Sequence, residues 1–277
     1  MILFKEFDNG FPYIEILNDA ACAEIAFQGA HIFHYSRCDS EPLFWLSEES
    51  EFEFDKAIRG GIPICWPSFG MNNPSLEQHG FARVGMWELV STDELDERTT
   101  QVVLKLTHTI KSLKAWHYKF ELQLKIIISD TLTMELTTLN LDEHPFILTQ
   151  AFHTYFQVSN ISDISIEGLD SKPYLDALTS KNHTQIGDIT FDQEIDRVYQ
   201  EVDSAITLKD KYRSTEIKNE GSSSTVVWNP WIEKSKRLSA ISEHAYESFV
   251  CIETANAFED FKIVQPNESY TLKTTIY

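Results

Sequence analysis

Hydrophobic and polar residues alternate with a period of two along much of this chain. Apolar side chains occupy every second position from Phe120 to Ile128, and after a turn at 129–131 the alternation resumes from Leu132 to Leu136. Because successive side chains of a β-strand point to opposite faces, this pattern predicts an antiparallel hairpin with one buried face. Similar short segments, rich in β-branched and aromatic residues, predict further strands at 102–106, 226–228, 249–252 and 270–276.

The helical period of 3.6 residues is nearly absent. Only the segments 174–179 and 232–238 favour helices, which we expect to lie in loops. The segment 170–221 is more polar and irregular, and Gly221 to Ser224 predicts a mobile surface turn rather than a linker. Because strands occur from one end to the other without a break in composition, we predict an all-β protein. Its expected form is a large antiparallel β-sandwich that comprises residues 1–277 as a single domain.

The charge balance narrows the range of partners. The chain has 23 Lys and Arg against 43 Asp and Glu, which gives a formal net charge of -20. A field of this sign repels phosphate backbones and anionic lipids, so we expect neither nucleic acid nor a membrane surface as a partner. If the ligand is itself an anion, the protein must supply a local cationic pocket, and any cluster of arginines becomes informative.

The distribution of apolar residues and cysteines bears on location. The N-terminal segment lacks a basic region followed by an apolar run, and no stretch approaches the roughly 18 apolar residues of a membrane span. We interpret the scattered cysteines as reduced thiols, because no C-x-x-C pair occurs and a chain of this size needs no disulfide bonds to stabilise its fold. These features favour a cytoplasmic protein, which we expect to be a monomer. The cysteines are Cys22, Cys38, Cys65 and Cys251.

Two polar stretches combine arginine with glycine. Arg59 precedes two glycines in a segment that two prolines stiffen, which is typical of a rigid loop that presents a side chain. About ten residues after this segment, Gln78, His79 and Arg83 surround further glycines. The alternative is that both arginines pair with surface acids, for which the candidates are Glu51, Asp55 and Glu88.

Three further residues are candidates for chemistry. His153 lies among aromatic residues, where a hydrogen-bonded core histidine is the structural alternative to a catalytic one. Glu253 interrupts an apolar strand, so it either emerges at a strand end or serves a site. Asp196 ends an acid-rich run in which we interpret Asp192 and Glu194 as solvated loop residues.

Other reaction classes lack sequence support. The chain contains no P-loop, dinucleotide fingerprint, nucleophile elbow or H-E-x-x-H motif. The nine histidines could in principle include a metal trio with Glu253, but the H-x-x-H at His31 and His34 lacks an adjacent carboxylate and nothing else has tight ligand spacing. We therefore expect no metal.

Taken together, these stretches resemble the glucose-6-phosphate 1-epimerase branch of the aldose 1-epimerase family. The resemblance covers essentially the whole chain, and six motifs occur in the family's order. It implies a β-sandwich of the galactose mutarotase-like type, which agrees with the strand pattern. The motifs are R-G-G-I-P-I-C-W-P at 59–67, Q-H-G-F-A-R at 78–83, H-T-Y-F at 153–156, E-I-D-R-V-Y at 194–199, V-W-N-P-W at 227–231 and V-C-I-E at 250–253.

The resemblance also implies roles for individual residues. His153 matches the family's general acid and Glu253 its general base, and no cofactor is implied. The ligand-contacting positions match Arg59, Gln78, Arg83 and Asp196, with His79 an additional candidate in the same motif. The sequence departs from the commoner pattern at 151–152, 239–241 and 266–267, and none of these departures touches the acid, the base or the arginines.

The implied activity is interconversion of the α and β anomers of a hexose 6-phosphate, with Arg59 and Arg83 on the phosphate. A planar guanidinium forms paired hydrogen bonds with phosphate oxygens. We also expect a carboxylate near the sugar, Asp196, to help keep His153 protonated. Two alternatives stay open: mutarotation of unphosphorylated aldoses, and a sandwich that binds a sugar phosphate without turnover.

Overall fold

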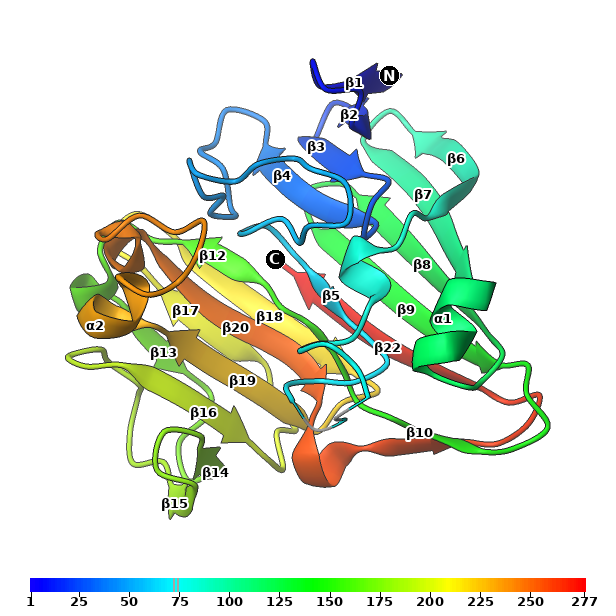
Figure 1. Cartoon of the computed structure of the whole chain (residues 1–277). Coiled ribbons are helices and arrows are strands. Elements are labelled where there is room, and N and C mark those ends of the chain that lie inside the picture. The colour runs from blue at the N-terminus through cyan, green and yellow to red at the C-terminus, as the bar shows by residue number, and fades with distance from the viewer. Residues whose placement is uncertain (72, 74) are drawn as a thin grey trace.

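The computed structural model describes residues 1–71, 73 and 75–277, and the chain in it forms almost entirely antiparallel β-sheet (Figure 1). Two large sheets lie against each other, and a smaller N-terminal sheet covers one end of them. The predicted all-β sandwich is confirmed. Within the described residues, no helix has the length and apolar character needed to span a membrane.

The first large sheet, which we call the site sheet, brings together segments that are distant in sequence. Its central strand β20 is buried at every position, because the main core covers one face and loops cover the other. In spatial order its strands are β15 (Lys181–Thr184), β14 (Pro173–Asp176), β16 (Ile195–Tyr199), β19 (Ser224–Asn229), β20 (Phe249–Asn256), β11 (Gln150–Phe152) and β5 (Ile64–Cys65), and β12 (Tyr155–Gln157) also pairs with β20.

The second large sheet contains the predicted hairpin, with Phe120–Ile128 paired to Leu132–Asn140. The apolar positions of both strands are fully buried and the intervening ones are not, as the alternation predicts. In order this sheet consists of β13 (Ser165–Glu167), β17 (Ile206–Lys209), β18 (Ser214–Glu220), β22 (Ser269–Ile276), β9 (Leu132–Asn140), β8 (Phe120–Ile128), β7 (Thr99–Thr107) and β6 (Glu88–Asp96).

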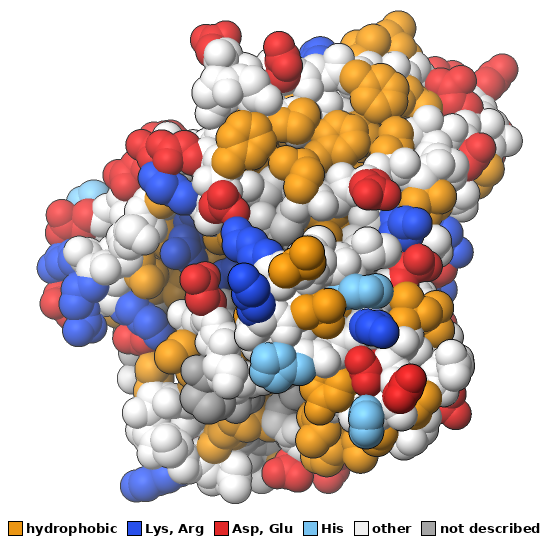
Figure 2. Space-filling model, turned by 45° about the vertical axis from the view of Figure 1, so that its right-hand side comes forward, with side chains coloured by type: hydrophobic (Ala, Val, Ile, Leu, Met, Phe, Trp, Pro, Cys, Tyr) orange, Lys and Arg blue, Asp and Glu red, His pale blue; other side chains and the backbone are white. Residues whose placement is uncertain are grey.

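The N-terminal sheet adds a separate aromatic cluster to the main core. Phe7 stacks between Tyr13 and Phe52, and Phe33 packs edge-on against Phe52. A broad hydrophobic area is visible on this part of the molecule in Figure 2. The strands of this sheet are β1 (Ile2–Glu6), β2 (Pro12–Leu17), β3 (Ala21–Ala26) and β4 (His31–Arg37), while β10 (Phe146–Leu148) and β21 (Lys262–Val264) form a separate pair.

Helices are short, and they differ in part from the prediction. The expected helix at 174–179 is wrong, because residues 173–176 form strand β14, which is hydrogen-bonded to strands on both sides. The helix expected at 232–238 is present as α2 (Trp231–Ser235). The helix α1 (Ile110–Ala115) was not predicted, although Thr109 and Ser112 form a capping box at its start. The 3-10 helices are η1 (Ala82–Val84), η2 (Ile161–Asp163), η3 (Ala245–Ser248) and η4 (Phe258–Asp260).

The serine turn after β18 is not the mobile turn that its sequence predicts. The side chain of Asp260 accepts hydrogen bonds from both the backbone N–H and the hydroxyl of Ser223. The hydroxyl of Ser224 donates to the carbonyl oxygen of Ala255 at 2.8 Å, and Ser224 is fully buried. The small side chains therefore fix this turn against the end of β20, because their hydroxyls replace the water that would otherwise solvate the backbone.

Candidate active site

The two predicted catalytic residues lie beside each other at the middle of the site sheet. Glu253 is on β20, and His153 is in the tight connection between β11 and β12. The imidazole Nε2 of His153 lies 3.4 Å from the carboxylate Oε1 of Glu253. The exposed fractions are 9% for His153 and 2% for Glu253, so this acid–base pair is shielded from water.

Each member of the pair has one polar atom that lacks a hydrogen-bond partner among the described residues. These atoms are Nδ1 of His153 and Oε2 of Glu253. Buried polar groups in proteins are nearly always hydrogen-bonded, and leaving one unpaired costs about 1 to 3 kcal/mol. The unpaired atoms therefore mark this place as one where a polar ligand can bind.

Burial also sets the proton positions in the pair. It lowers the pKa of His153 well below its ordinary range, and the positive charges of Arg83 and Arg59 act in the same direction. It raises the pKa of Glu253 well above its ordinary range, and the charge of Asp196 adds to this effect. Burial therefore disfavours the charged form of both side chains in the free protein. The expectation that Asp196 keeps His153 protonated is wrong, because burial and the arginines dominate.

The R-G-G segment presents Arg59 as predicted, and its glycines are needed for close packing. Gly60 and Gly61 have positive φ angles of 108° and 60°. A Cβ atom on Gly60 would lie 2.5 Å from the carbonyl oxygen of Trp45, so no larger residue fits there. The buried His31 holds the same loop, because its Nε2 lies 2.8 Å from the carbonyl oxygen of Gly60. His31 therefore has a structural role in this loop rather than the role of a metal ligand.

Arg59 and Arg83 have neutral partners. Arg59 Nη1 lies 3.4 Å from the hydroxyl of Tyr155, and Arg83 Nη2 donates to the carbonyl oxygen of Gln78 at 2.7 Å. The described part of the chain offers neither arginine a salt bridge. The alternative in which both pair with surface acids is therefore wrong: Glu51 and Asp55 pair with the lysines Lys56 and Lys111.

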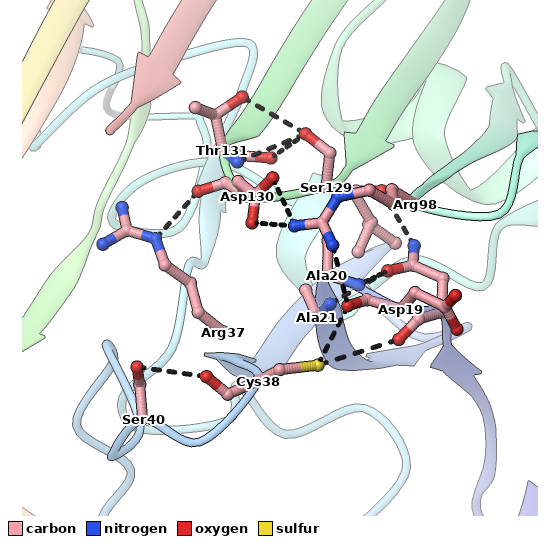
Figure 3. Close-up of polar contacts among 12 residues, drawn as sticks. Asp19, Ala20, Ala21, Arg37, Cys38, Ser40, Arg98, Ser129, Asp130 and Thr131 are labelled. Atoms are coloured by element: carbon pink, nitrogen blue, oxygen red, sulfur yellow. Dashed lines mark hydrogen bonds and ion pairs between the residues drawn. The ribbon is translucent and has the colours of Figure 1, made fainter.

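A second group of arginines shows what pairing with an acid looks like (Figure 3). Arg98 forms two hydrogen bonds with the carboxylate of Asp130, at 2.7 and 2.8 Å. Arg37 donates from Nε to the carbonyl oxygen of Asp130 at 2.8 Å. The side chains of Arg98 and Asp130 are more than half exposed.

His79 extends the site from the same loop as Gln78. Its ring packs edge-on against that of His153, with 5.5 Å between the ring centroids. The backbone N–H of Gly70 donates to its Nδ1 at 3.3 Å, which fixes a neutral ring with the proton on Nε2. Burial lowers the pKa of His79 to about 3, with Arg83 and Arg59 contributing. Gln78 itself is exposed.

Asp196 lies on β16, two strands from Glu253, and has a partner that sequence reasoning missed. Lys234 of α2 lies 3.5 Å from the carboxylate of Asp196 and 2.9 Å from that of Glu194. Glu194 is therefore paired rather than solvated, whereas Asp192 is exposed as expected. Burial raises the pKa of Asp196, and Lys234 opposes that shift. The only sequence signal for Lys234 is its place just after the V-W-N-P-W motif.

Aromatic rings enclose His153. Tyr155 stacks on it, with 4.9 Å between centroids and 17° between planes, and Trp228 packs edge-on at 5.8 Å. Tyr155 and Trp228 lie in motifs that the sequence analysis singled out, but the residues next to them in the sequence did not indicate that they pack against His153. Cys65 and Cys251 belong to two buried hydrophobic clusters, and burial raises the pKa of both thiols well above the usual range. All four cysteines of the described chain are free, as predicted.

The fold and the site define a class of protein: a β-sandwich of the sugar-mutarotase type that buries a histidine–glutamate pair at the centre of one sheet. The sequence model of the aldose 1-epimerase family matches residues 12–277. The chain belongs to the aldose 1-epimerase family.

Individual relatives support the same assignment. A Cenchrus ciliaris protein with the provisional name glucose-6-phosphate 1-epimerase is 36% identical over 90% of this chain and 79% of its own length. An Escherichia coli protein with the same provisional name is 31% identical over 90% of this chain and 84% of its own length.

Solved structures agree with the fold. The crystal structure of a protein from Salmonella typhimurium, YeaD, provisionally described as a mutarotase, superposes with a TM-score of 0.92 at 28% identity and covers 99% of this chain and 92% of its own. A galactose mutarotase-like protein from Clostridium acetobutylicum superposes at 0.77 with 13% identity, over 100% and 98% of the two chains, which shows the shared fold alone.

Proposed function

We propose that this protein is a hexose-6-phosphate mutarotase that interconverts the α and β anomers of glucose 6-phosphate. The observation that carries the proposal is a buried His153–Glu253 pair beside two arginines that have no acidic partner within the described residues. The provisional names of the curated relatives point to the same substrate.

The reaction opens and recloses the hemiacetal ring. The Glu253 carboxylate removes the proton of the anomeric hydroxyl, and the His153 imidazolium delivers a proton to the ring oxygen, so the C1–O5 bond breaks and an aldehyde forms. Rotation about C1–C2 exposes the other face of the aldehyde. The ring oxygen then attacks C1, His153 removes its proton and Glu253 returns one to the new anomeric oxygen.

The 3.4 Å separation of His153 Nε2 and Glu253 Oε1 supports the proposal, because two groups this close can both reach one hemiacetal. Proton transfer by a positioned side chain contributes typically about 10² to 10⁴-fold to a rate, and the remaining acceleration comes from holding the sugar in register with both groups. The atoms without partners, His153 Nδ1 and Glu253 Oε2, are available to hydrogen-bond donors and acceptors of the sugar. No cofactor is needed, because the reaction transfers protons and breaks and re-forms one C–O bond, with no net oxidation or reduction.

Arg59 and Arg83 would hold the 6-phosphate. A guanidinium forms paired, charge-assisted hydrogen bonds with phosphate oxygens, and neither arginine must give up a carboxylate partner to do so. The two arginines supply the cationic pocket that a phosphorylated substrate requires on a protein of net charge -20. Asp196 and Gln78 would contact hydroxyl groups of the sugar.

The test is the α/β exchange rate of glucose 6-phosphate by NMR magnetisation transfer, with free glucose measured beside it. We expect fast exchange of the phosphorylated sugar, loss of this exchange in Glu253→Gln, and slower exchange of glucose. Equal acceleration of both sugars would instead support a mutarotase of unphosphorylated aldoses. Binding of glucose 6-phosphate with no acceleration would support a protein that binds the sugar phosphate without turnover.

A further inference from the structure

Arg59 is connected to the acid–base pair through one side chain. Its guanidinium lies 3.4 Å from the hydroxyl of Tyr155, and the ring of Tyr155 stacks on the imidazole of His153. Tyr155 is 1% exposed, so little water separates the guanidinium from the imidazole along this route. A charge at Arg59 therefore acts on His153 across a poorly screened path.

Arg83 approaches the pair from a different element. It extends from η1 toward Gln78, and the next residue, His79, packs its ring against that of His153. The titratable and charged groups that face His153 are therefore Glu253 from β20, Tyr155 from β12, His79 and Arg83 from the loop and turn at 78–84, and Arg59 from the loop before β5.

In this cluster, Glu253 is the one acid that faces His153, and the arginines bear uncompensated positive charge. They disfavour a second positive charge on His153, in agreement with the lowered pKa of that residue. The contact routes from both arginines, through Tyr155 and through the loop of His79, end on the imidazole of His153 rather than on Glu253. A negative charge on the arginines would therefore act mainly on the histidine.

We infer that a phosphate dianion bound by Arg59 and Arg83 switches on the His153–Glu253 pair, and that it does so even when it is not joined to the sugar. This inference rests on the proposed function and deepens it. It makes the phosphate an activator of the chemistry as well as a handle for binding, so that phosphorylated sugars are preferred in the proton-transfer step itself.

The switch moves one proton and needs no other reactant. On this inference the proton lies on Glu253 in the free protein, since burial disfavours the charge on both groups, and this is the arrangement that follows ring opening. With the dianion on the arginines, this proton passes from the carboxyl oxygen to His153 Nε2, 3.4 Å away. The pair then has the carboxylate and the imidazolium from which ring opening starts.

The experiment supplies the substrate in two pieces. The α/β exchange of free glucose is measured with and without inorganic phosphite, at constant ionic strength and pH. We expect phosphite to raise kcat/KM for glucose in a saturable way by at least about 10-fold, which corresponds to a shift of one pKa unit in the acid. The nitrogen chemical shifts of the His153 ring, assigned by their absence in His153→Asn, should move toward the imidazolium values as phosphite binds.

Arginine variants distinguish activation by phosphite bound at the site from general catalysis by phosphite as a buffer. Arg59→Ala should abolish the activation, and Arg83→Ala gives the same test if the first variant does not fold. Arg98→Ala removes an exposed arginine that pairs with Asp130, so this variant should retain the full activation. Acceleration that persists equally in all variants would be buffer catalysis and would overturn the inference.

The outcomes keep the two claims apart. Fast exchange of glucose 6-phosphate together with no effect of phosphite on glucose, or with inhibition by phosphite, overturns the inference and leaves the proposed function intact. Failure to accelerate exchange of glucose 6-phosphate overturns the proposed function itself.

Discussion

Two groups of arginines in this protein have different kinds of partner. Arg98, in the turn between β6 and β7, donates two hydrogen bonds to the carboxylate of Asp130, in the turn between β8 and β9 (Figure 3). Both side chains are exposed. In the site, the guanidinium groups of Arg59 and Arg83 bond only to a phenol and a backbone carbonyl within the described residues. On the face shown in Figure 2, basic side chains gather near the middle, below the hydrophobic area.

The difference shows how the partner of an arginine changes what a bound anion would gain there. An exposed ion pair contributes little to stability, but it satisfies the cation and leaves no demand for an anion. A partly buried guanidinium without a carboxylate has lost water and gained no compensating charge, so a bound anion gains more there than at the surface. The predictions below test this contrast from the largest expected effect to the smallest.

The largest effect should come from the acid–base pair. Glu253→Gln keeps the shape of the side chain and removes the base, so the exchange rate of glucose 6-phosphate should fall about 10² to 10⁴-fold. His153→Asn should cause a loss of similar size. Unfolding by denaturant provides the control for Glu253→Gln, because this change keeps the shape of a side chain that has an unpaired buried oxygen, and the free energy of unfolding should not fall. A rate loss below about tenfold would exclude these residues as the main proton-transfer groups.

Arg59→Ala and Arg83→Ala should have the next largest effect. Loss of a charge-assisted hydrogen bond to phosphate costs roughly 1.5 to 3 kcal/mol, so kcat/KM for glucose 6-phosphate should fall roughly 10- to 100-fold. Exchange of free glucose should not fall.

Arg59→Lys should also be impaired, because lysine lacks the planar fork of donors. Arg98→Ala is the matched control and should exchange glucose 6-phosphate at the original rate. Equal losses for the phosphorylated and the free sugar would contradict a phosphate role for these arginines.

Acid should weaken the loop of Arg59 through His31. Burial lowers the pKa of His31 to about 4 from its ordinary value near 6.5, so the unfolded chain binds a proton in a pH range where the folded protein does not. Stability is therefore present above pH 6.5 and is lost as the pH falls toward 4. Between pH 7 and pH 5 this residue should account for about 2 kcal/mol of the lost free energy of unfolding.

Denaturant unfolding at the two pH values measures this loss. His31→Gln removes the titrating group and should show a smaller fall than the original protein. An equal fall in both would show that His31 does not cause the acid sensitivity.

The smallest effect should come from the exposed ion pair. Arg98→Ala should leave the midpoint of thermal unfolding almost unchanged, because the Arg98–Asp130 pair lies in solvent and is screened by salt. Calorimetry at low and high salt measures the contribution. A large drop in the midpoint at both salt concentrations would show that the Arg98–Asp130 pair stabilises the fold more than the exposure of the two side chains indicates.

Much of the fold followed from local pattern. The hairpin of β8 and β9 could be predicted because its alternating side chains encode one buried face, and strand register preserves that alternation. The segment at Tyr174 could not, because hydrogen bonds from β15 and β16 on both sides override its weak helical preference. The turn at Ser223 looked mobile because its anchor, Asp260, is distant in sequence.

For the site, the sequence by itself determined which residues are candidates for chemistry. The motifs singled out His153, Glu253 and both arginines by residue type and order. Only the tertiary structure decided that the histidine and the glutamate are 3.4 Å apart, that the arginines lack an acidic partner among the described residues, and that Lys234 holds Asp196. It also decided that burial disfavours the charged form of both members of the pair. Proton positions depend on burial and on charges from several strands and loops, and these become neighbours only when the chain has folded.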